Sequence, residues 1–138
     1  MKILSTLLLA FMTVGMLSSH APSATGIEFY HNLEEAKKIA KKENKMIFLD
    51  GYASWCGPCK MMDKRVFQNQ QVAHFYNANF INVKIDMDKN VKLRNEYKIR
   101  AYPTLLYLNA DGSVIQKKVG FHDSGDFLKL GEKAKVRS

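Results

Sequence analysis

The stretch SWCGPCK, residues 54–60, contains both cysteines of this chain, Cys56 and Cys59, with only Gly57 and Pro58 between them. Two kinds of chemistry use such a pair. It can supply half of a four-ligand metal site, or it can open and close as a disulfide. A bridge that closes so short a loop contributes little to stability by restricting the unfolded chain. The value of the pair is therefore chemical, and the rest of the sequence has to distinguish the two uses.

A zinc site at this pair would need two further ligands. The histidines do not supply them at a suitable spacing, because His74 and His122 lie far apart in the sequence. His31 lies upstream of the pair, and His20 falls in a segment that we expect to be removed. We therefore predict neither a metal site nor a cofactor, and we favour the dithiol.

The first residues have the features of a secretory signal peptide. Met1 and Lys2 are followed by an uncharged, mainly apolar run over residues 3–17, and small residues come next. The run is shorter than the roughly 20 residues that a membrane-spanning helix needs. We expect residues 1–24 to be the signal, with an uncertain cleavage site, and residues 25–138 to be the exported, soluble domain, periplasmic in a bacterium. An uncleaved anchor is the alternative.

Composition limits the remaining possibilities. The chain has 138 residues, 46% of them hydrophobic, which suits one domain with its own core. Its formal net charge is +8, but the lysines of residues 37–45 stand among Glu34, Glu35 and Glu43, as on a solvated helix surface. No nucleic-acid-binding motif accompanies the charge. We expect a monomer with no nucleic-acid partner.

The hydrophobic pattern predicts alternating strands and helices. Strands are predicted over residues 46–50, 80–86, 104–108 and 114–120, and helices over residues 33–43, 59–67, 69–76 and 91–97 and from residue 123 onward. Asn32 and Glu35 form a capping-box pattern at the first helix, and the last helix has a weak start at Gly125. This order predicts an α/β fold with a mixed central sheet and helices on both faces.

The cysteine pair follows a buried strand and opens a helix. Cys56 would lie at the helix N-terminus, where unpaired N–H groups and the helix dipole stabilise a thiolate. Pro58 is tolerated there because first-turn N–H groups have no intrahelical partner to lose. Cys59 lies one turn further and could attack a mixed disulfide held on Cys56. The spacing therefore favours an exchange in which Cys56 attacks and Cys59 resolves.

Residues 47–60, IFLDGYASWCGPCK, resemble the active-site segment of the thioredoxin family, and WCGPCK is among its most specific short motifs. Residues 99–108, IRAYPTLLYL, resemble the segment that carries a cis-proline, and residues 84–90, KIDMDKN, resemble the third strand. Residues 66–80 are similar to the corresponding part of exported bacterial members. The resemblance covers about residues 27 to 134, and it implies the thioredoxin fold and a thiol–disulfide oxidoreductase.

Four catalytic residues follow from this resemblance. Cys56 matches the attacking cysteine and Cys59 the resolving one. Asp50 matches a buried carboxylate that is thought to accept the proton of the resolving cysteine, and Lys84 matches the lysine paired with it. A desolvated carboxylate has a raised pKa and can act as a base near neutral pH. The alternative is that Asp50 merely caps the end of its strand.

The resemblance also implies substrate-binding residues. Trp55 matches the aromatic residue beside the cysteines, although a single tryptophan is equally a core residue. Pro103 matches the cis-proline, which would bring the Tyr102 backbone beside Cys56, where an extended substrate strand could pair. The sequence departs from the family at Gly51-Tyr52, where two large aromatic residues are common, and at Tyr102, where a smaller aliphatic residue is common. The rim around the sulfurs therefore differs.

Three function classes remain. The first is an exported reductase of protein disulfides, the second is an isomerase or oxidant on the same fold, and the third, a non-catalytic binding module, is disfavoured by the intact CGPC. Gly57 and Pro58 add neither charge nor a side-chain donor near the Cys56 sulfur, which favours a reductant. The expected partners are exported proteins with disulfides and a membrane-embedded thiol donor that keeps the chain reduced.

Overall fold

A computed structural model describes residues 25–137, so the predicted signal segment, residues 1–24, lies outside the described residues. Four strands form one sheet in the order β2-β1-β3-β4. Strand β2 pairs parallel with β1, whereas β3 pairs antiparallel with both β1 and β4. The strands are β1 (Met46–Tyr52), β2 (Phe80–Asp86), β3 (Thr104–Leu108) and β4 (Val114–Val119). Every predicted strand is present, and β1 continues to Tyr52 rather than ending at Asp50.

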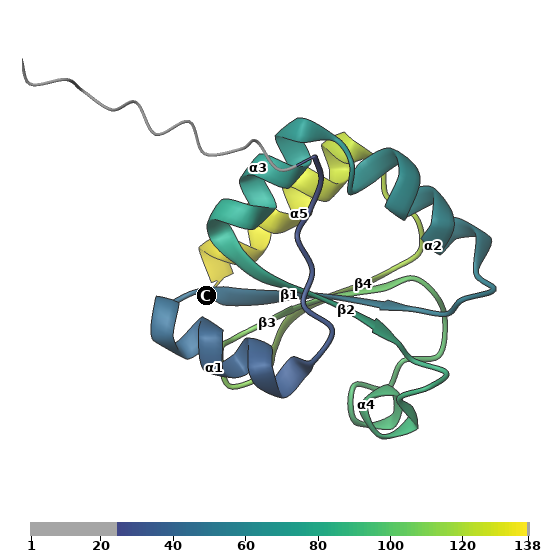
Figure 1. Ribbon diagram of the computed structural model, residues 1–138, viewed down its shortest axis with the longest axis horizontal. Coiled ribbons are helices and arrows are strands. Elements are labelled where there is room, and N and C mark those ends of the chain that lie inside the picture. Colours follow the sequence, from purple (N-terminus) through teal and green to yellow (C-terminus); the bar gives the residue numbers. More distant parts are fainter. Residues whose placement is uncertain (1–24, 138) are drawn as a thin grey trace, which may run out of the picture.

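Helices cover both faces of this sheet, which confirms the predicted α/β architecture. The helical elements are α1 (Leu33–Glu43), α2 (Gly57–Met61), a π-helical turn η1 (Met62–Val66), α3 (Gln70–Asn79), α4 (Val91–Glu96) and α5 (Ser124–Arg137). Figure 1 shows α1 and α4 on one side of the sheet and α2, α3 and α5 on the other. Within residues 25–137, no helix has the length and apolar character needed to cross a membrane.

Side-chain caps explain where two of the helices begin. The Asn32 side chain accepts a hydrogen bond of 3.0 Å from the backbone N–H of Glu35, which satisfies one free donor of the first turn of α1. In α5 the Asp123 side chain accepts 2.9 Å from the N–H of Asp126. This cap starts α5 at Ser124, close to the start at residue 123 that the sequence predicts, and it provides the start signal that Gly125 lacks.

Alternating side chains of the central strands divide the core into two layers. Phe48 packs in the layer that contains α3 and α5, whereas Ile47 and Leu49 pack in the layer that contains α1. In the first layer, the rings of Tyr76 and Phe127 stack with centroids 4.1 Å apart. Because β1 is buried on both faces, its sequence is a continuous apolar run rather than an alternating one.

The same alternation determines where the polar residues of the strands point. Asp50 follows Phe48 by two residues, so it faces the side of the sheet that α2 and α3 cover. The parallel register places Asp50 directly opposite Lys84 on β2. Both residues lie near the carboxyl ends of their strands, at the edge of the sheet where α2 begins. This is the position at which open α/β sheets commonly bind ligands.

Candidate active site

The two cysteines form a disulfide at the N-terminus of α2. Cys56 is the N-cap residue, and its sulfur accepts a 3.2 Å hydrogen bond from the backbone N–H of Cys59. Pro58 occupies the first turn, where no backbone donor is lost. Because free N–H groups and the helix dipole point toward the Cys56 sulfur, this position stabilises negative charge on it.

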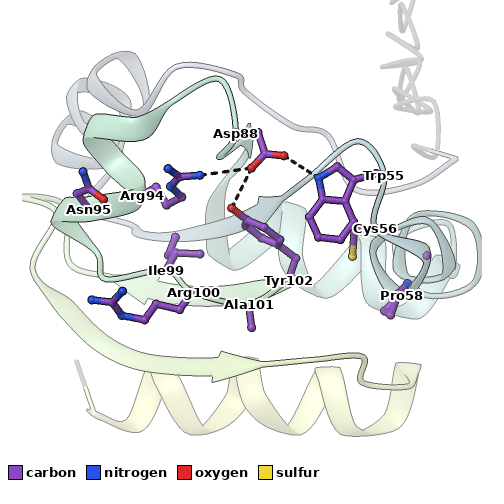
Figure 2. Close-up of a pocket in the computed structure, with 11 residues that line it drawn as sticks. Trp55, Cys56, Pro58, Asp88, Arg94, Asn95, Ile99, Arg100, Ala101 and Tyr102 are labelled. Carbon is purple, nitrogen blue, oxygen red and sulfur yellow. Dashed lines mark hydrogen bonds and ion pairs between the residues drawn. The ribbon is translucent and has the colours of Figure 1, made fainter.

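The two sulfurs differ in their access to the surface. A groove of about 820 Å³ is lined by Cys56, whereas Cys59 is not among its lining residues. We call this the Cys56 groove; it is lined by Trp55, Cys56, Gly57, Pro58, Asp88, Arg94, Asn95, Ile99, Arg100, Ala101 and Tyr102 (Figure 2). Both cysteines are largely buried, Cys56 with 3% and Cys59 with 1% of its surface exposed, so the groove and not the exposed area distinguishes them. A disulfide of a second molecule would therefore reach Cys56 first.

Trp55 and Tyr102 line the groove together with Cys56, and Pro103 follows Tyr102 in the chain. The Tyr102–Pro103 peptide bond is cis. Trp55 is 68% exposed, so it is a surface residue of the site and not part of the core. Its ring packs edge-on against the ring of Tyr102, with centroids 5.7 Å apart. The large residue before the proline therefore forms one wall of the groove together with the tryptophan.

Asp88 holds this wall together. One oxygen, Oδ2, accepts a 2.7 Å hydrogen bond from the indole N–H of Trp55. The other, Oδ1, accepts from the Tyr102 hydroxyl at 3.3 Å and lies 3.5 Å from the Arg94 guanidinium. Figure 2 shows Asp88 between these three groups. A single carboxylate with three donors thus fixes both aromatic side chains of the groove.

Asp50 lies in a very different environment on the covered face of the sheet. Its residue is 1% exposed, and Oδ2 accepts a 2.6 Å hydrogen bond from the Lys84 ammonium. The other oxygen, Oδ1, is buried and has no hydrogen-bond partner among the described residues. Burial raises the pKa of Asp50, and the attraction of Lys84 offsets this only in part.

A second carboxylate shares the same lysine. Asp63, in η1, lies 2.5 Å from the Lys84 ammonium and is 43% exposed. The ammonium also lies 4.5 Å from the ring centroid of Tyr52 and 5.3 Å from that of Phe67. Burial alone would lower the pKa of Lys84, but Asp50 and Asp63 together raise it. Lys84 is therefore a firmly charged group between one buried and one partly exposed acid.

Sequence reasoning placed Asp50, Lys84, Trp55, Tyr102 and Pro103 at the site, and the structure brings all five to the end of the sheet where the disulfide lies. It missed Asp63 and Asp88. Asp63 contacts Lys84 from the π-helical turn η1, and no sequence pattern predicts such a turn. Asp88 could have been found, because an acid just beyond a parallel strand faces the edge where ligands bind.

The described histidines do not gather near the cysteines to form a ligand set. Among residues 25–137, no cluster of at least three His, Cys, Asp or Glu side chains is arranged to hold a metal ion. His74 is exposed on α3. His31 and His122 each contact a backbone carbonyl, those of Lys84 and Gly120 respectively.

Comparison with known proteins places this geometry in a family. Residues 33–135 match the family described as thioredoxin-like domain. Thioredoxin-1 of Drosophila melanogaster is 42% identical over 72 residues, which are 52% of this chain and 64% of that protein. The match thus spans less than two thirds of the length of this relative.

Two solved structures extend the comparison. A proposed disulphide-isomerase from Bacteroides thetaiotaomicron is 40% identical, with a TM-score of 0.73 over 83% of this chain and 98% of that one. A thioredoxin from Thermus thermophilus has a TM-score of 0.72 at 20% identity, over 80% of this chain and 88% of that one. The second likeness concerns the fold alone, and it confirms the predicted thioredoxin fold.

Proposed function

The chain belongs to the thioredoxin-like family, and on that premise we propose that it is a thiol–disulfide oxidoreductase that reduces protein disulfides. One observation carries the proposal. The Cys56–Cys59 disulfide caps a helix, and of its two sulfurs only that of Cys56 borders the groove. An arrangement of this kind separates an attacking sulfur from a resolving one, whereas a structural bridge needs no such difference.

The reaction begins with the reduced pair. The Cys56 thiolate attacks one sulfur of a substrate disulfide, which forms a mixed disulfide and releases the other substrate sulfur as a thiolate. Cys59 then loses its proton and attacks the Cys56 sulfur, which releases the second substrate sulfur. Two electrons pass to the substrate, and the chain is left with the Cys56–Cys59 disulfide. A substrate strand beside the Tyr102–Pro103 bond would present its disulfide to Cys56.

Asp50 is the proposed acceptor of the Cys59 proton. Its buried position and its unpaired Oδ1 support this role, because a carboxylate with a raised pKa and a vacant acceptor is a better base than a fully solvated one. Lys84 lowers the pKa of Asp50 and so limits the rise that burial causes, which lets the carboxylate ionise and act as a base. It also stays charged when Asp50 takes up the proton, because Asp63 remains its partner.

Single cysteine variants test the proposal. Cys56→Ser should abolish the acceleration of insulin reduction by dithiothreitol and leave only the uncatalysed rate, because the attacking thiolate is absent. Cys59→Ser should instead stall after the first attack and accumulate mixed disulfides, which are visible as dithiothreitol-sensitive bands on a non-reducing gel. Equal trapping by both variants would contradict the assigned roles, and full acceleration of insulin reduction by Cys56→Ser would overturn the proposed activity.

An isomerase is the second candidate, and the likeness to the proposed disulphide-isomerase of Bacteroides thetaiotaomicron favours it. The reduction potential separates the two. General values run from about −270 mV for thioredoxin to about −180 mV for protein disulfide isomerase. Since no charged group stands between the cysteines, we expect a midpoint nearer the first value. Equilibration with glutathione, read by Trp55 fluorescence, measures it, and a midpoint above about −180 mV would favour the isomerase.

Export belongs to the same proposal. A reductant in an oxidising compartment becomes oxidised unless it is recharged, so a membrane-embedded thiol donor would supply its electrons. The mature, soluble chain would then act on exported proteins that carry disulfides. N-terminal sequencing of the native protein tests this: a start near residue 25 supports it, and intact Met1 in the membrane fraction would contradict it.

A further inference from the structure

The Cys56 groove has two chemically different ends. Figure 2 shows Cys56 and Pro58 at one end, and Arg94, Asn95 and Arg100 at the other. The first end carries the reactive sulfur. The second consists of two guanidinium groups and an amide, and a protein segment bound at the sulfur would extend toward it. The chemistry of the second end should therefore affect which segments bind.

The two arginines at the second end make few interactions with other residues of the chain. In the described part of the protein, Arg100 forms no ion pair or side-chain hydrogen bond, and its residue is exposed. Arg94 contacts Asp88 through one nitrogen at 3.5 Å, which is a long ion pair. A guanidinium has five N–H donors, so most donors of both arginines are free to bind another molecule.

Asp88 cancels only part of this positive charge, because it is one acid beside two arginines. It is the one acidic residue among those that line the groove. Both of its oxygens already accept from donors of the same wall, Trp55 on Oδ2 and Tyr102 on Oδ1. The lining of the second end thus has a net positive charge, and its free groups are the two guanidinium groups and the neutral amide of Asn95. Guanidinium groups bind carboxylates with paired hydrogen bonds.

We propose that Arg94 and Arg100 bind an acidic side chain of the substrate protein, so that the chain prefers disulfides with a nearby Asp or Glu. This inference rests on the proposed reductase function and names its substrate class. The apolar wall of Trp55 and Tyr102 holds the segment next to the cysteine, while the two arginines select its charge. Arg100 contributes most, because Arg94 is partly engaged with Asp88.

Disulfide-linked peptides that differ in one residue test this preference. Each peptide carries Glu, Gln or Lys at one position, scanned from two to five residues from the attacked cysteine, and kcat/KM for reduction is measured. We expect the Glu peptide to exceed the Gln peptide by about 5- to 10-fold at its best position, and the Lys peptide to be the poorest. In 1 M salt the difference between the peptides should shrink, because the Debye length falls to about 3 Å and charges further apart than this are largely screened.

Variants assign the preference to the arginines. Arg100→Ala should remove most of the Glu-over-Gln preference, and Arg94→Ala/Arg100→Ala should remove all of it. Arg100→Glu should invert the order and favour the Lys peptide, whereas Arg100→Lys should keep part of the original order. Arg137→Ala, at the exposed end of α5 and away from the groove, is the matched control for lost charge and should keep the full preference.

The outcomes separate this inference from the proposed function. Equal reduction of all three peptides by the natural chain overturns the inference and leaves the reductase intact. A preference that persists in the double variant also overturns it. Failure to reduce any peptide, or insulin, overturns the proposed function and the inference together.

Discussion

Asp50 lies near the carboxyl end of β1 and Asp88 just beyond the carboxyl end of β2, yet these two carboxylates have opposite environments. Asp88 is exposed and receives three donors, from Trp55, Tyr102 and Arg94. Asp50 is buried and receives one, from Lys84, with Oδ1 left without a partner. The saturated carboxylate organises a binding surface. Asp50 has one acceptor atom without a partner, which is what its proposed role as proton acceptor requires.

The difference also shows what determines the free energy of keeping each carboxylate ionised in the folded protein. A solvated carboxylate with several donors is stable as an anion at neutral pH. A buried carboxylate with one ammonium partner loses more hydration than the pair returns. Asp63 reduces the consequence, because it keeps Lys84 paired even when Asp50 is neutral. Lys84, Asp50 and Asp63 therefore form a set of three charges on the buried side of the site. Removing one acid leaves Lys84 with a partner, whereas removing both does not.

The largest expected effect comes from removing both partners of Lys84. In Asp50→Asn/Asp63→Asn, the ammonium would have no acidic partner among the described residues, and we expect a loss of about 3 kcal/mol in the free energy of unfolding. Urea unfolding of the oxidised protein measures it. Adding Lys84→Met should recover most of the loss, because the orphaned charge is then gone. If the double variant equals the sum of its single variants, the three charges do not act as a set.

The Asp50→Asn substitution alone should have the opposite effect and increase the free energy of unfolding. A raised pKa means that the folded state holds the Asp50 proton more tightly than the unfolded chain does. The cost of the ionised group is thus absent below the unfolded pKa of about 3.9, and it grows as pH rises through the raised folded pKa. At pH 7 we expect Asp50→Asn to be more stable by about 1 to 2 kcal/mol.

Urea unfolding between pH 4 and pH 8 checks this sign. The stability curves of the natural chain and of Asp50→Asn should meet near pH 4, close to the unfolded pKa, and separate above it. A constant offset at every pH would instead mean that the substitution acts through packing.

The smallest expected effect on stability comes from Asp88→Asn. Its contacts are partly exposed, and an asparagine can still accept from Trp55, so the change in stability should stay below about 1 kcal/mol. The groove should respond more than the fold does. Loss of the charged acceptor should alter Trp55 fluorescence and raise KM for insulin with little change in kcat. If Asp88→Asn raised the apparent pKa of the resolving step, Asp88 would also act in that step, and the proposed difference from Asp50 would be wrong.

These comparisons also show which parts of the site a sequence can reveal. The cysteines and the buried strand before them follow from local pattern and spacing, whereas Asp50 and Lys84 could be placed in advance only through the resemblance to the thioredoxin family. Asp63 could not, because its aim depends on the π-helical turn η1 after α2. Arg94 and Arg100 could not either, because their common end of the groove arises only when α4 folds beside the loop before β3.

The pH dependence of the resolving step tests most directly whether Asp50 accepts the Cys59 proton. The reduced protein is mixed with an aromatic disulfide, and stopped-flow absorbance records two coloured thiolates, the first released on attack by Cys56 and the second on resolution by Cys59. We predict that Asp50→Asn slows the second release at pH 7 by about 10-fold or more and moves its pH profile upward, because a general base is lost. Asp88→Asn should leave that profile in place. An Asp50→Asn profile that matches the natural chain in both rate and midpoint would contradict the account, since Asp50 would then not accept the Cys59 proton.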